Sequence, residues 1–418
     1  MMNKRKIIDM AKSARKASYR LSELSIARKR KALVTMAKAL INKKKYILSQ
    51  NKIDLANAKR NGLSKAMVER LMLDDKRIRQ MTDSLKQVSR LKSYVGEIIS
   101  SHKRPNGLVI DKVRVAIGVI FIIFESRPNV TSDCMGLSLM SSNVVILKGG
   151  SEAINSNLAI FNVLAKAAYT CGVPKNSFNI LATTDRKIVD TLLNQYEDID
   201  LVIPRGGESL ISAVVAKSKI PVIKHYKGVC HLYVDKTADL NMAEKITLNA
   251  KLQRPGVCNA IETLLIHKDI AKKFLATTGK KLLYSNVKLR GCQWSRKYLK
   301  SIKKATLNDW STEYLDLILS IKVVGSLNEA IEHINTFGSH HSDAIVTKNK
   351  TNAELFLKRV DSACVYVNAS TRFTDGYEFG MGAEIGISTD RLHARGPMAL
   401  EELTTYKYVI RGSGQIRK

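Results

Sequence analysis

The sequence predicts an α/β protein with two doubly wound domains and a smaller β extension. The first observation is an alternation of strand-like and helix-like runs between residues 115 and 235. The second is a repeat of that alternation between residues 245 and 368. The third is a pair of strand-like stretches, 108–115 and 403–410, outside both regions. At 418 residues the chain is long enough for two or three domains with separate cores.

The N-terminal region, up to about residue 95, is predicted to be helical. Apolar residues recur every three or four positions in Ile26–Ile41 and Lys65–Leu91, which is the pattern of amphipathic helices. Asp74-Asp75 and Thr82-Asp83 are candidate helix starts. Alternation over 108–115 then predicts a hairpin strand, and a late strand at 403–410 is expected to pair with it or with a partner subunit.

The first α/β region alternates predicted strands and helices. Strands are expected at Val115–Phe124, Val144–Leu147, Phe178–Leu181, Leu201–Ile203, Val222–Ile223 and His231–Val234. Helices are expected at Ser132–Met140, Glu152–Thr170, Arg186–Tyr196 and Glu208–Ser218. This order predicts a parallel sheet covered by helices, in which ligands bind at the carboxyl ends of the strands.

Two glycine pairs follow predicted strands of this region. They stand in Lys148-Gly149-Gly150-Ser151 and in Arg205-Gly206-Gly207, each beside a cation and just before a helix. Glycine permits close approach of a ligand, and a helix N-terminus offers N–H groups to an anion. One such pair is as typical of a plain turn as of a phosphate site. Two in one sheet favour a nucleotide site, although the G-x-G-x-x-G fingerprint is absent.

The second α/β region begins with a cysteine in a loop. A helix at Ala238–Gln253 leads into Arg254-Pro255-Gly256-Val257-Cys258, and a strand at Ile261–Ile266 follows. Proline and glycine interrupt regular structure, so Cys258 is expected on an exposed turn where the Arg254 guanidinium favours its thiolate. A buried, inert thiol is the alternative. Further helices are expected at 271–283 and 328–337, with strands at 318–324, 344–346 and 365–367.

The composition limits which other classes of protein are possible. The 69 basic and 37 acidic residues give a net charge of +32, but the cations are scattered and aromatic residues are only 6%. We interpret these basic residues as lying on solvated faces of the protein, not as forming a nucleic-acid-binding surface. The six cysteines show neither CxxC pairs nor metal-ligand spacing, so neither a disulfide framework nor a metal site is expected. With no apolar run of about 18 residues and no signal-peptide pattern, a soluble, cytoplasmic protein is expected.

Several long motifs resemble those of the gamma-glutamyl phosphate reductase family. They are ESRPNVT at 125–131, VILKGGSEA at 145–153, QRPGVCNA at 253–260, VYVNASTRFTDGYEFGMGAEIG at 365–386 and LHARGPMALEELTTYK at 392–407. The resemblance runs nearly end to end, and this family belongs to the aldehyde dehydrogenase superfamily. Two departures are Leu252, where the family has a small polar residue, and Ser142-Asn143, where it has glycine-asparagine.

The resemblance implies an aldehyde-dehydrogenase-like fold of three parts. A cofactor-binding domain would comprise residues 1–100, 117–247 and 370–398, and a catalytic domain residues 248–369 with the nucleophilic cysteine. Residues 101–116 and 399–418 would form an oligomerisation flap. A homo-oligomer is therefore expected.

The resemblance also implies the chemistry. L-glutamyl 5-phosphate would be reduced with NADPH to L-glutamate 5-semialdehyde, with release of phosphate, in the second step of proline biosynthesis. Glutamate 5-kinase would be the functional partner. The implied catalytic residues are Cys258, which forms a thioester, and Asn129. The implied cofactor residues are Lys148, Gly149, Gly150, Ser151, Arg205, Gly206 and Gly207, and the implied substrate residues are Arg254, Ser370, Thr371 and Arg372.

One omission suits this chemistry. Hydrolytic aldehyde dehydrogenases carry a water-activating glutamate, whereas the corresponding stretch 224–231 (KHYKGVCH) has no acid. Two alternatives stay open. One is another phosphorylating or CoA-linked aldehyde dehydrogenase, and the other, motivated by the charge of +32, is a basic nucleic-acid-binding protein.

Overall fold

The computed structural model describes residues 4–224 and 227–417, which fold into two compact units. Unit 1 comprises Met1–Lys224, Gly380–Gly386 and Met398–Lys418, and unit 2 comprises His225–Phe379 and Ile387–Pro397. Both units contain parallel sheets with helices, as the predicted fold class requires. In this division residues 227–247 and most of 370–398 belong to unit 2. No helix within the described residues is long and apolar enough to cross a membrane.

Helices make up the start of unit 1. They are α1 (Lys4–Ser22), α2 (Ile26–Asn42), α3 (Lys44–Arg60), α4 (Lys65–Leu71) and α5 (Asp75–Arg90). The predicted helix start at Asp74 is confirmed, because its carboxylate accepts a hydrogen bond from the Arg77 N–H. The predicted start at Thr82-Asp83 is wrong. Thr82 lies inside α5 and donates its hydroxyl to the Ile78 carbonyl.

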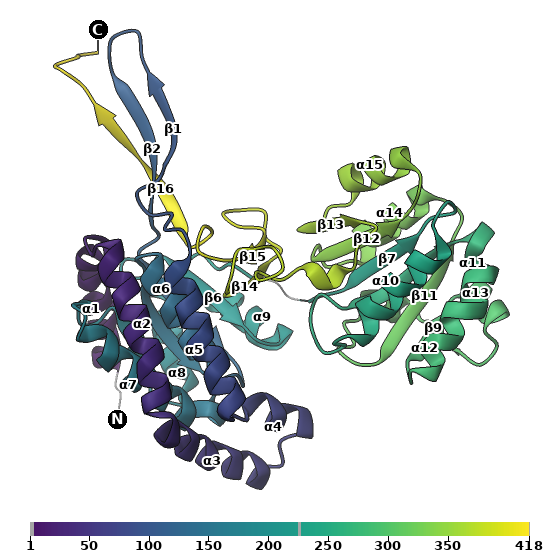
Figure 1. Cartoon of the computed structure of the whole chain (residues 1–418), viewed down its shortest axis with the longest axis horizontal. Helices are drawn as coiled ribbons and strands as arrows, with labels where there is room; N and C mark the ends of the chain where they lie inside the picture. The colour runs from purple at the N-terminus through teal and green to yellow at the C-terminus, as the bar shows by residue number, and fades with distance from the viewer. Residues whose placement is uncertain (1–3, 225–226, 418) are drawn as a thin grey trace. The chain divides into compact units, whose positions relative to one another are not determined.

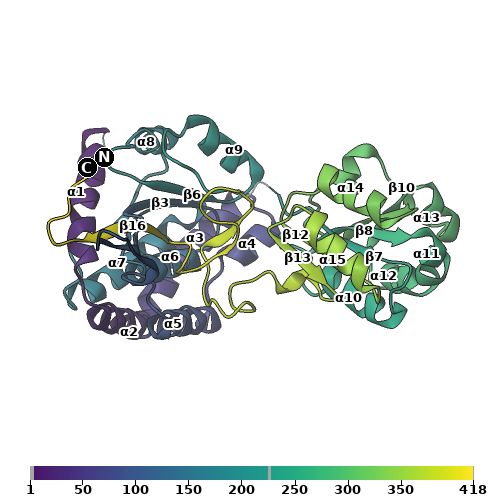
Figure 2. The same cartoon turned by 90° about the horizontal axis from the view of Figure 1, so that it is seen from above.

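A parallel sheet with strand order β5-β4-β3-β6 forms the centre of unit 1. Its strands are β3 (Val119–Phe124), β4 (Val144–Gly149), β5 (Phe178–Ile180) and β6 (Leu201–Arg205). The connecting helices are α6 (Asn129–Met140), α7 (Ile154–Tyr169, after the 3-10 turn η1, Ser151–Ala153), α8 (Arg186–Leu192) and α9 (Glu208–Lys217). Helices α6 and α7 pack on this sheet, and α2 and α5 lie side by side over them (Figure 2).

Two predicted strands of this sheet differ in the structure. Val222 forms only an isolated bridge with Val202. The stretch predicted as His231–Val234 is β7 (Cys230–Val234), which pairs with strands of unit 2 instead. The alternating pattern shows that a strand exists, but its partners are set by contacts distant in the sequence.

A three-stranded antiparallel sheet forms the long extension that projects from the helices of unit 1 (Figure 1). It contains β1 (Ile98–Lys103), β2 (Val109–Ala116) and β16 (Thr404–Arg411), so the pairing expected between the 108–115 strand and the late strand is confirmed. The predicted strand Val115–Phe124 is confirmed for Val119–Phe124, which is β3, but its start is wrong, because the chain divides at Gly118. Gly118 has φ 131°, and a Cβ there would lie 2.2 Å from the Asp200 carboxylate, so only glycine fits.

Unit 2 contains a parallel sheet with order β10-β9-β11-β8-β7-β12-β13. Besides β7, its strands are β8 (Ile261–His267), β9 (Lys288–Gly291), β10 (Lys303–Lys304), β11 (Ile318–Val324), β12 (Ser342–Val346) and β13 (Cys364–Val367). Its helices are α10 (Leu240–Leu252), α11 (Lys268–Phe274), α12 (Lys280–Tyr284), α13 (Gln293–Tyr298), α14 (Leu327–Phe337) and α15 (Lys350–Arg359), with the π-turn η2 (Leu275–Gly279) and the 3-10 turns η3 (Leu307–Ser311) and η4 (Thr371–Phe373). Strands β14 (Gly386–Ser388) and β15 (Gly396–Met398) form a separate pair.

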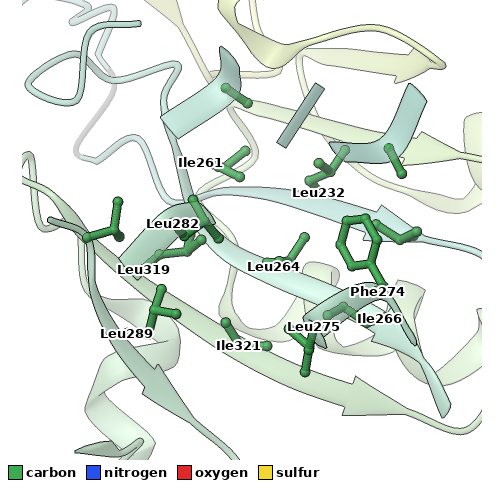
Figure 3. Packing of buried hydrophobic residues seen from close by; sticks show 14 of the residues in the cluster. Leu232, Ile261, Leu264, Ile266, Phe274, Leu275, Leu282, Leu289, Leu319 and Ile321 are labelled. Carbon is green, nitrogen blue, oxygen red and sulfur yellow. The ribbon is translucent and has the colours of Figure 1, made fainter. Parts of the chain in front are cut away.

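Alternate side chains of this sheet enter two cores. Leu232, Leu264 and Ile321 pack against the side of α11, η2 and α12, where Phe274 and Leu275 meet them (Figure 3). Tyr233, Leu265 and Ile345 belong to the cluster that includes residues of α14 and α15, such as Ile331 and Phe356. Strands β7, β8 and β12 are therefore buried on both faces, as in a doubly wound sheet, whereas the edge strand β10 is exposed.

Candidate active site

The carboxyl ends of three strands meet at one edge of unit 1. Phe124, the last residue of β3, pairs with Gly149 of β4 and with Arg205 of β6. The two glycine-cation turns predicted from the sequence therefore lie on either side of the end of β3. A helix or helical turn begins directly after each turn, at Ser151 and at Glu208. This edge carries two cations and the start of α9, which attract an anionic ligand, while the Gly207 N–H already donates to Glu125 Oε2 at 3.0 Å.

The glycines of these turns have packing roles within the protein. A Cβ at Gly149 would lie 2.0 Å from Asn157 Nδ2, and one at Gly150 would lie 2.1 Å from Glu152 Oε1. At Gly206 it would lie 2.6 Å from the carboxyl carbon of Glu125. At Gly207, by contrast, it would have no described atom within 4 Å. Gly207 is thus the position in these turns where a ligand has room to approach the backbone.

Lys148 and Glu152 give this edge opposite charges. Lys148 Nζ donates to the Gly149 carbonyl at 2.6 Å. Glu152 Oε1 accepts from both the N–H and the hydroxyl of Ser126, at 2.7 and 2.6 Å. Burial alone would raise the pKa of Glu152, but these hydrogen bonds and the Lys148 charge outweigh burial and lower it. Glu152 is therefore a carboxylate next to the predicted cofactor turn, and no sequence motif marked it as a functional residue.

Asn129 begins α6 at the same edge. Its Nδ2 donates to Asp133 Oδ2 at 3.2 Å, and Asp133 also accepts from the Ser84 hydroxyl. A carboxamide has two N–H donors, of which Asp133 takes one. Burial raises the pKa of Asp133, against the opposing effects of Ser84 and of the Arg205 charge.

In unit 2, Cys258 lies at the edge of the sheet where the strands begin, not where they end. Its loop follows the end of α10 and leads into Ile261, the first residue of β8, beside the start of β7 at Cys230. Pro255 and Gly256 form a turn in this loop, and Cys258 is half-buried. The predicted position on a turn between helix and strand is confirmed. The thiol is thus at the amino edge of its sheet.

Gly228 packs directly on the backbone of the cysteine. A Cβ at Gly228 would lie 2.0 Å from the Cys258 carbonyl oxygen and 2.5 Å from its Cα. The Gly228 N–H donates to Glu313 Oε1 at 2.9 Å, and the Cys230 thiol donates to the Cys258 carbonyl at 3.2 Å. These contacts fix the backbone from which the Cys258 side chain extends.

Glu313 is a functional candidate that the sequence did not reveal. The stretch 224–231 has no acid, as noted, and its residues 225 and 226 lie outside the described residues. Glu313 reaches the Gly228 N–H from a loop before β11, 85 residues later in the chain. No local motif marks this residue, so only the three-dimensional structure brings it to the cysteine loop.

The segment 370–374 lies against the cysteine loop. The Thr371 hydroxyl donates to the Asn259 carbonyl at 2.7 Å, and Asn259 Nδ2 donates to the Thr374 carbonyl at 2.8 Å. The Ser370 hydroxyl accepts from the Arg372 N–H and caps η4. The structure therefore brings the predicted substrate residues Ser370, Thr371 and Arg372 next to the loop of Cys258.

Two guanidinium groups lie near Cys258. Arg372 Nε donates to Gln253 Oε1 at 2.8 Å, which ties Arg372 to the start of the loop. Burial, followed by the nearby charge of Arg254, lowers the pKa of Arg372, whereas Cys258 acts in the opposite direction. Arginine remains charged under such shifts, so this region presents concentrated positive charge beside the thiol. It suits an anionic substrate and a thiolate.

Comparison with known proteins identifies the family. The family model described as "Aldehyde dehydrogenase family" matches residues 1–289. The chain belongs to the aldehyde dehydrogenase family. The curated relatives include proteins named gamma-glutamyl phosphate reductase from Caldanaerobacter subterraneus subsp. tengcongensis and from Clostridium acetobutylicum. Each is 54% identical, over 98% and 99% of this chain respectively and 99% of the relative.

Solved structures agree with this assignment. The crystal structure of gamma-glutamyl phosphate reductase from Thermotoga maritima is similar, with a TM-score of 0.97 and 47% identity over 99% of this chain and 100% of that chain. An acetylating aldehyde dehydrogenase from Geobacillus thermoglucosidasius has a TM-score of 0.71 at 16% identity, over 99% of this chain and 98% of that chain. The second likeness concerns the fold alone. The predicted aldehyde-dehydrogenase-like fold is confirmed.

Proposed function

We propose that this aldehyde dehydrogenase family member reduces L-glutamyl 5-phosphate to L-glutamate 5-semialdehyde with release of phosphate, using NADPH. The observation that carries the proposal is the 54% identity, over nearly the whole chain, to proteins named gamma-glutamyl phosphate reductase. The half-buried Cys258, with two arginines beside it, supplies a matching nucleophile and charge. Through this substrate, glutamate 5-kinase is the proposed functional partner, in a cytoplasmic biosynthetic sequence.

The covalent step would begin at Cys258. Its thiolate attacks the acyl carbon of the substrate, forming a C–S bond, and the phosphate oxygen leaves with the electrons of the broken C–O bond. The positive charge of Arg254 and Arg372 favours the thiolate before the attack and the departing phosphate after it. A bound nicotinamide cofactor would supply the hydride that reduces the resulting thioester. The reduced adduct on Cys258 then breaks its C–S bond, which releases the aldehyde and restores the Cys258 thiolate.

The other proposed site residues would stabilise negative charge on the substrate or fix the groups that do so. We propose the Cys258 backbone N–H as a donor to the oxyanion that forms on the attacked carbonyl, and we keep Asn129 as a catalytic residue on the strength of the family resemblance. Arg372 has a guanidinium able to grip a carboxylate with two hydrogen bonds. Ser370 and Thr371 would act by fixing Arg372 and the cysteine loop, because both hydroxyls are engaged there.

The edge of the unit 1 sheet fits a nicotinamide cofactor. Lys148 and Arg205 place cations at the ends of β4 and β6, and the space around Gly207 opens at the start of α9. We propose that the turns Lys148–Ser151 and Arg205–Gly207 hold the cofactor, whose phosphates would meet N–H groups and cations there. The cationic residues favour NADPH over NADH.

The sheet β1-β2-β16 is the proposed oligomerisation flap. Strand β16 is at its edge, where backbone groups can pair with another chain. Tyr406, Tyr408 and Ile410 on this strand are 49%, 60% and 59% exposed. An exposed apolar edge of this kind suits a second copy of the protein.

Phosphate dependence tests the proposed reaction. The purified protein would be given glutamate semialdehyde and NADP⁺, and NADPH formation would be followed with phosphate, with CoA or with neither. We expect a rate that requires phosphate. A rate that requires CoA would support an acylating enzyme instead, and an equal rate without either would indicate hydrolysis. Salt-sensitive nucleic-acid binding without any such rate would favour the basic binding protein.

A further inference from the structure

A buried ion pair closes the base of the cysteine loop. Lys251 lies in the last turn of α10 and Glu262 is the second residue of β8, so residues 253–260 connect them. Lys251 Nζ lies 2.6 Å from Glu262 Oε2, and both side chains have no exposed surface. The pair thus joins the two ends of the loop that carries Cys258.

The same carboxylate holds a second loop. Glu262 Oε1 accepts from the Leu315 N–H at 3.1 Å, and Leu315 has a φ of 53°, which costs energy for a residue other than glycine. A Cβ at Gly256 would lie 3.6 Å from the Leu315 carbonyl oxygen, so this second loop runs beside the turn of the cysteine loop. Glu262 therefore connects α10, β8 and the loop around Leu315.

Stability alone is a weak reason for this pair. Burial, the largest influence on each group, raises the pKa of Glu262 to about 7 and lowers the pKa of Lys251. Removing both groups from water offsets much of their attraction, so an apolar pair of similar size often stabilises a fold equally well or better. An apolar pair does not, however, supply a hydrogen-bonded contact of fixed length and direction.

We propose that Lys251 and Glu262 are positioning residues, which fix the base of the 253–260 loop and thereby the place of the Cys258 thiol. This inference rests on the proposed function of Cys258 as the nucleophile. The other side of the loop is held by Asn259, whose amide donates to the Thr374 carbonyl. A displacement of about 1 Å at a nucleophile can reduce the rate about a hundredfold, so fixing both sides has a catalytic purpose.

The double variant Lys251→Met with Glu262→Leu tests the inference. It removes both charges together and leaves neither buried alone. We expect a thermal midpoint near that of the parent, a kcat lower by at least about thirtyfold, and a KM for the semialdehyde within about threefold of the parent value. Hydrogen exchange in the peptide 253–260 should be faster by at least about tenfold. A folded double variant with parental kcat and exchange would overturn the proposal.

Glu262→Gln provides a second test if the double variant does not fold. The amide retains the shape and can still accept from the Leu315 N–H, but the ionic attraction to Lys251 is lost. We expect kcat to fall by about five- to tenfold at an unchanged KM. A parental kcat would contradict the positioning role. The matched control is Lys281→Met, which removes an exposed ion pair with Glu244 in the same unit and should leave kcat unchanged.

A measurement without substrate separates this inference from the proposed function. Alkylation of Cys258 by iodoacetamide, followed by mass spectrometry of its peptide, reports the thiol directly. We expect the rate at pH 7 to differ from the parent rate by at least about threefold in the double variant. Absence of phosphate-dependent activity in the parent would defeat the proposed function alone. Parental alkylation and exchange rates in both Glu262 variants would defeat the positioning role alone.

Discussion

The two units contain the same kind of sheet but use opposite edges. In unit 1 the candidate ligand residues follow the carboxyl ends of β3, β4 and β6, where helices or helical turns begin. In unit 2 the cysteine loop comes from the end of α10 and enters β8 at its amino end. Helix N-termini attract anions, whereas helix C-termini present carbonyl groups and repel them. Unit 1 can therefore use backbone groups for an anionic ligand, while unit 2 needs side chains for its thiolate.

The contacts around Cys258 agree with this difference. Arg254 and Arg372 bring positive charge to a loop that the backbone alone would make unfavourable for an anion. Glycine is also used differently in the two units. Gly149 and Gly206 make room for side chains of unit 1, whereas Gly228 makes room for the backbone of the cysteine itself. A lesion in the cysteine loop of unit 2 should thus affect the chemical step, and a lesion in the glycine turns of unit 1 should affect cofactor affinity.

The largest effect is expected from Cys258→Ser. A serine hydroxyl is not ionised near neutral pH, so kcat should fall by at least about a thousandfold. The dissociation constant for NADPH, measured by fluorescence titration, should stay within about twofold, because the change lies in unit 2. The control is Cys292→Ser, at another half-buried cysteine of unit 2, which should retain activity. Retention of activity by Cys258→Ser would rule out the covalent mechanism.

Gly228→Ala should have the next largest effect. The new Cβ would overlap the Cys258 carbonyl oxygen, so the loop must move, at a cost of about 1–3 kcal/mol in the free energy of unfolding. We expect kcat to fall about a hundredfold with NADPH affinity retained. Gly256→Ala is the matched control, because its Cβ would be at an ordinary 3.6 Å from Leu315 O. Equal losses in both variants would show that any substitution in this region reduces activity, so the overlap at Gly228 would not be the cause.

Much of this arrangement was predictable from local sequence patterns. Pro255 and Gly256 predicted a turn before Cys258, and the glycine pairs predicted turns at strand ends, because backbone restrictions act over a few residues. A strand-like run also predicted β16, and its pairing with the 108–115 strand was one of the two expected alternatives. Such patterns encode local geometry, which a single sequence displays directly.

The contacts distant in sequence were not predictable in this way. Glu313 meets Gly228, and Glu262 meets Leu315, across 85 and 53 positions with no shared motif. The assignment of β7 to the second sheet depends on pairing with β8 and β12, which its own apolar pattern does not specify. The division of Val115–Phe124 at Gly118 depends on a positive φ within an otherwise apolar run. The roles of Ser370, Thr371 and Arg372 came from family resemblance alone.

A smaller effect, in unit 1, is expected from Gly207→Ala. Its Cβ would meet no described atom within 4 Å, so the free energy of unfolding should change by less than about 0.5 kcal/mol. If the cofactor approaches this backbone, the KM for NADPH should rise about tenfold while the alkylation rate of Cys258 stays constant. Gly149→Ala is the comparison, because its Cβ would overlap Asn157 and reduce stability as well. An unchanged KM in Gly207→Ala would place the cofactor elsewhere.

The smallest effect concerns how stability depends on pH, and it arises from a buried histidine of unit 2. Burial, followed by the charges of His231 and Lys322, lowers the pKa of His333 to about 2, so folded His333 is neutral. Its ring packs on His231, Trp310 and Phe337. An unfolded histidine takes up a proton below about pH 6.5, so the unfolded state binds more protons there. Stability of unit 2 should therefore fall as pH drops below about 6.5, by up to about 1.4 kcal/mol per pH unit.

Tryptophan fluorescence can follow this change in unit 2 alone. Both tryptophans of the chain, Trp294 and Trp310, lie in that unit. Urea unfolding between pH 5 and 8 should show a slope that His333→Phe reduces and that His102→Gln, on the exposed β1 strand of unit 1, leaves intact. An identical slope in His333→Phe would mean that other groups of unit 2 take up the proton. The buried His333 would then not be the source of the acid sensitivity expected of unit 2.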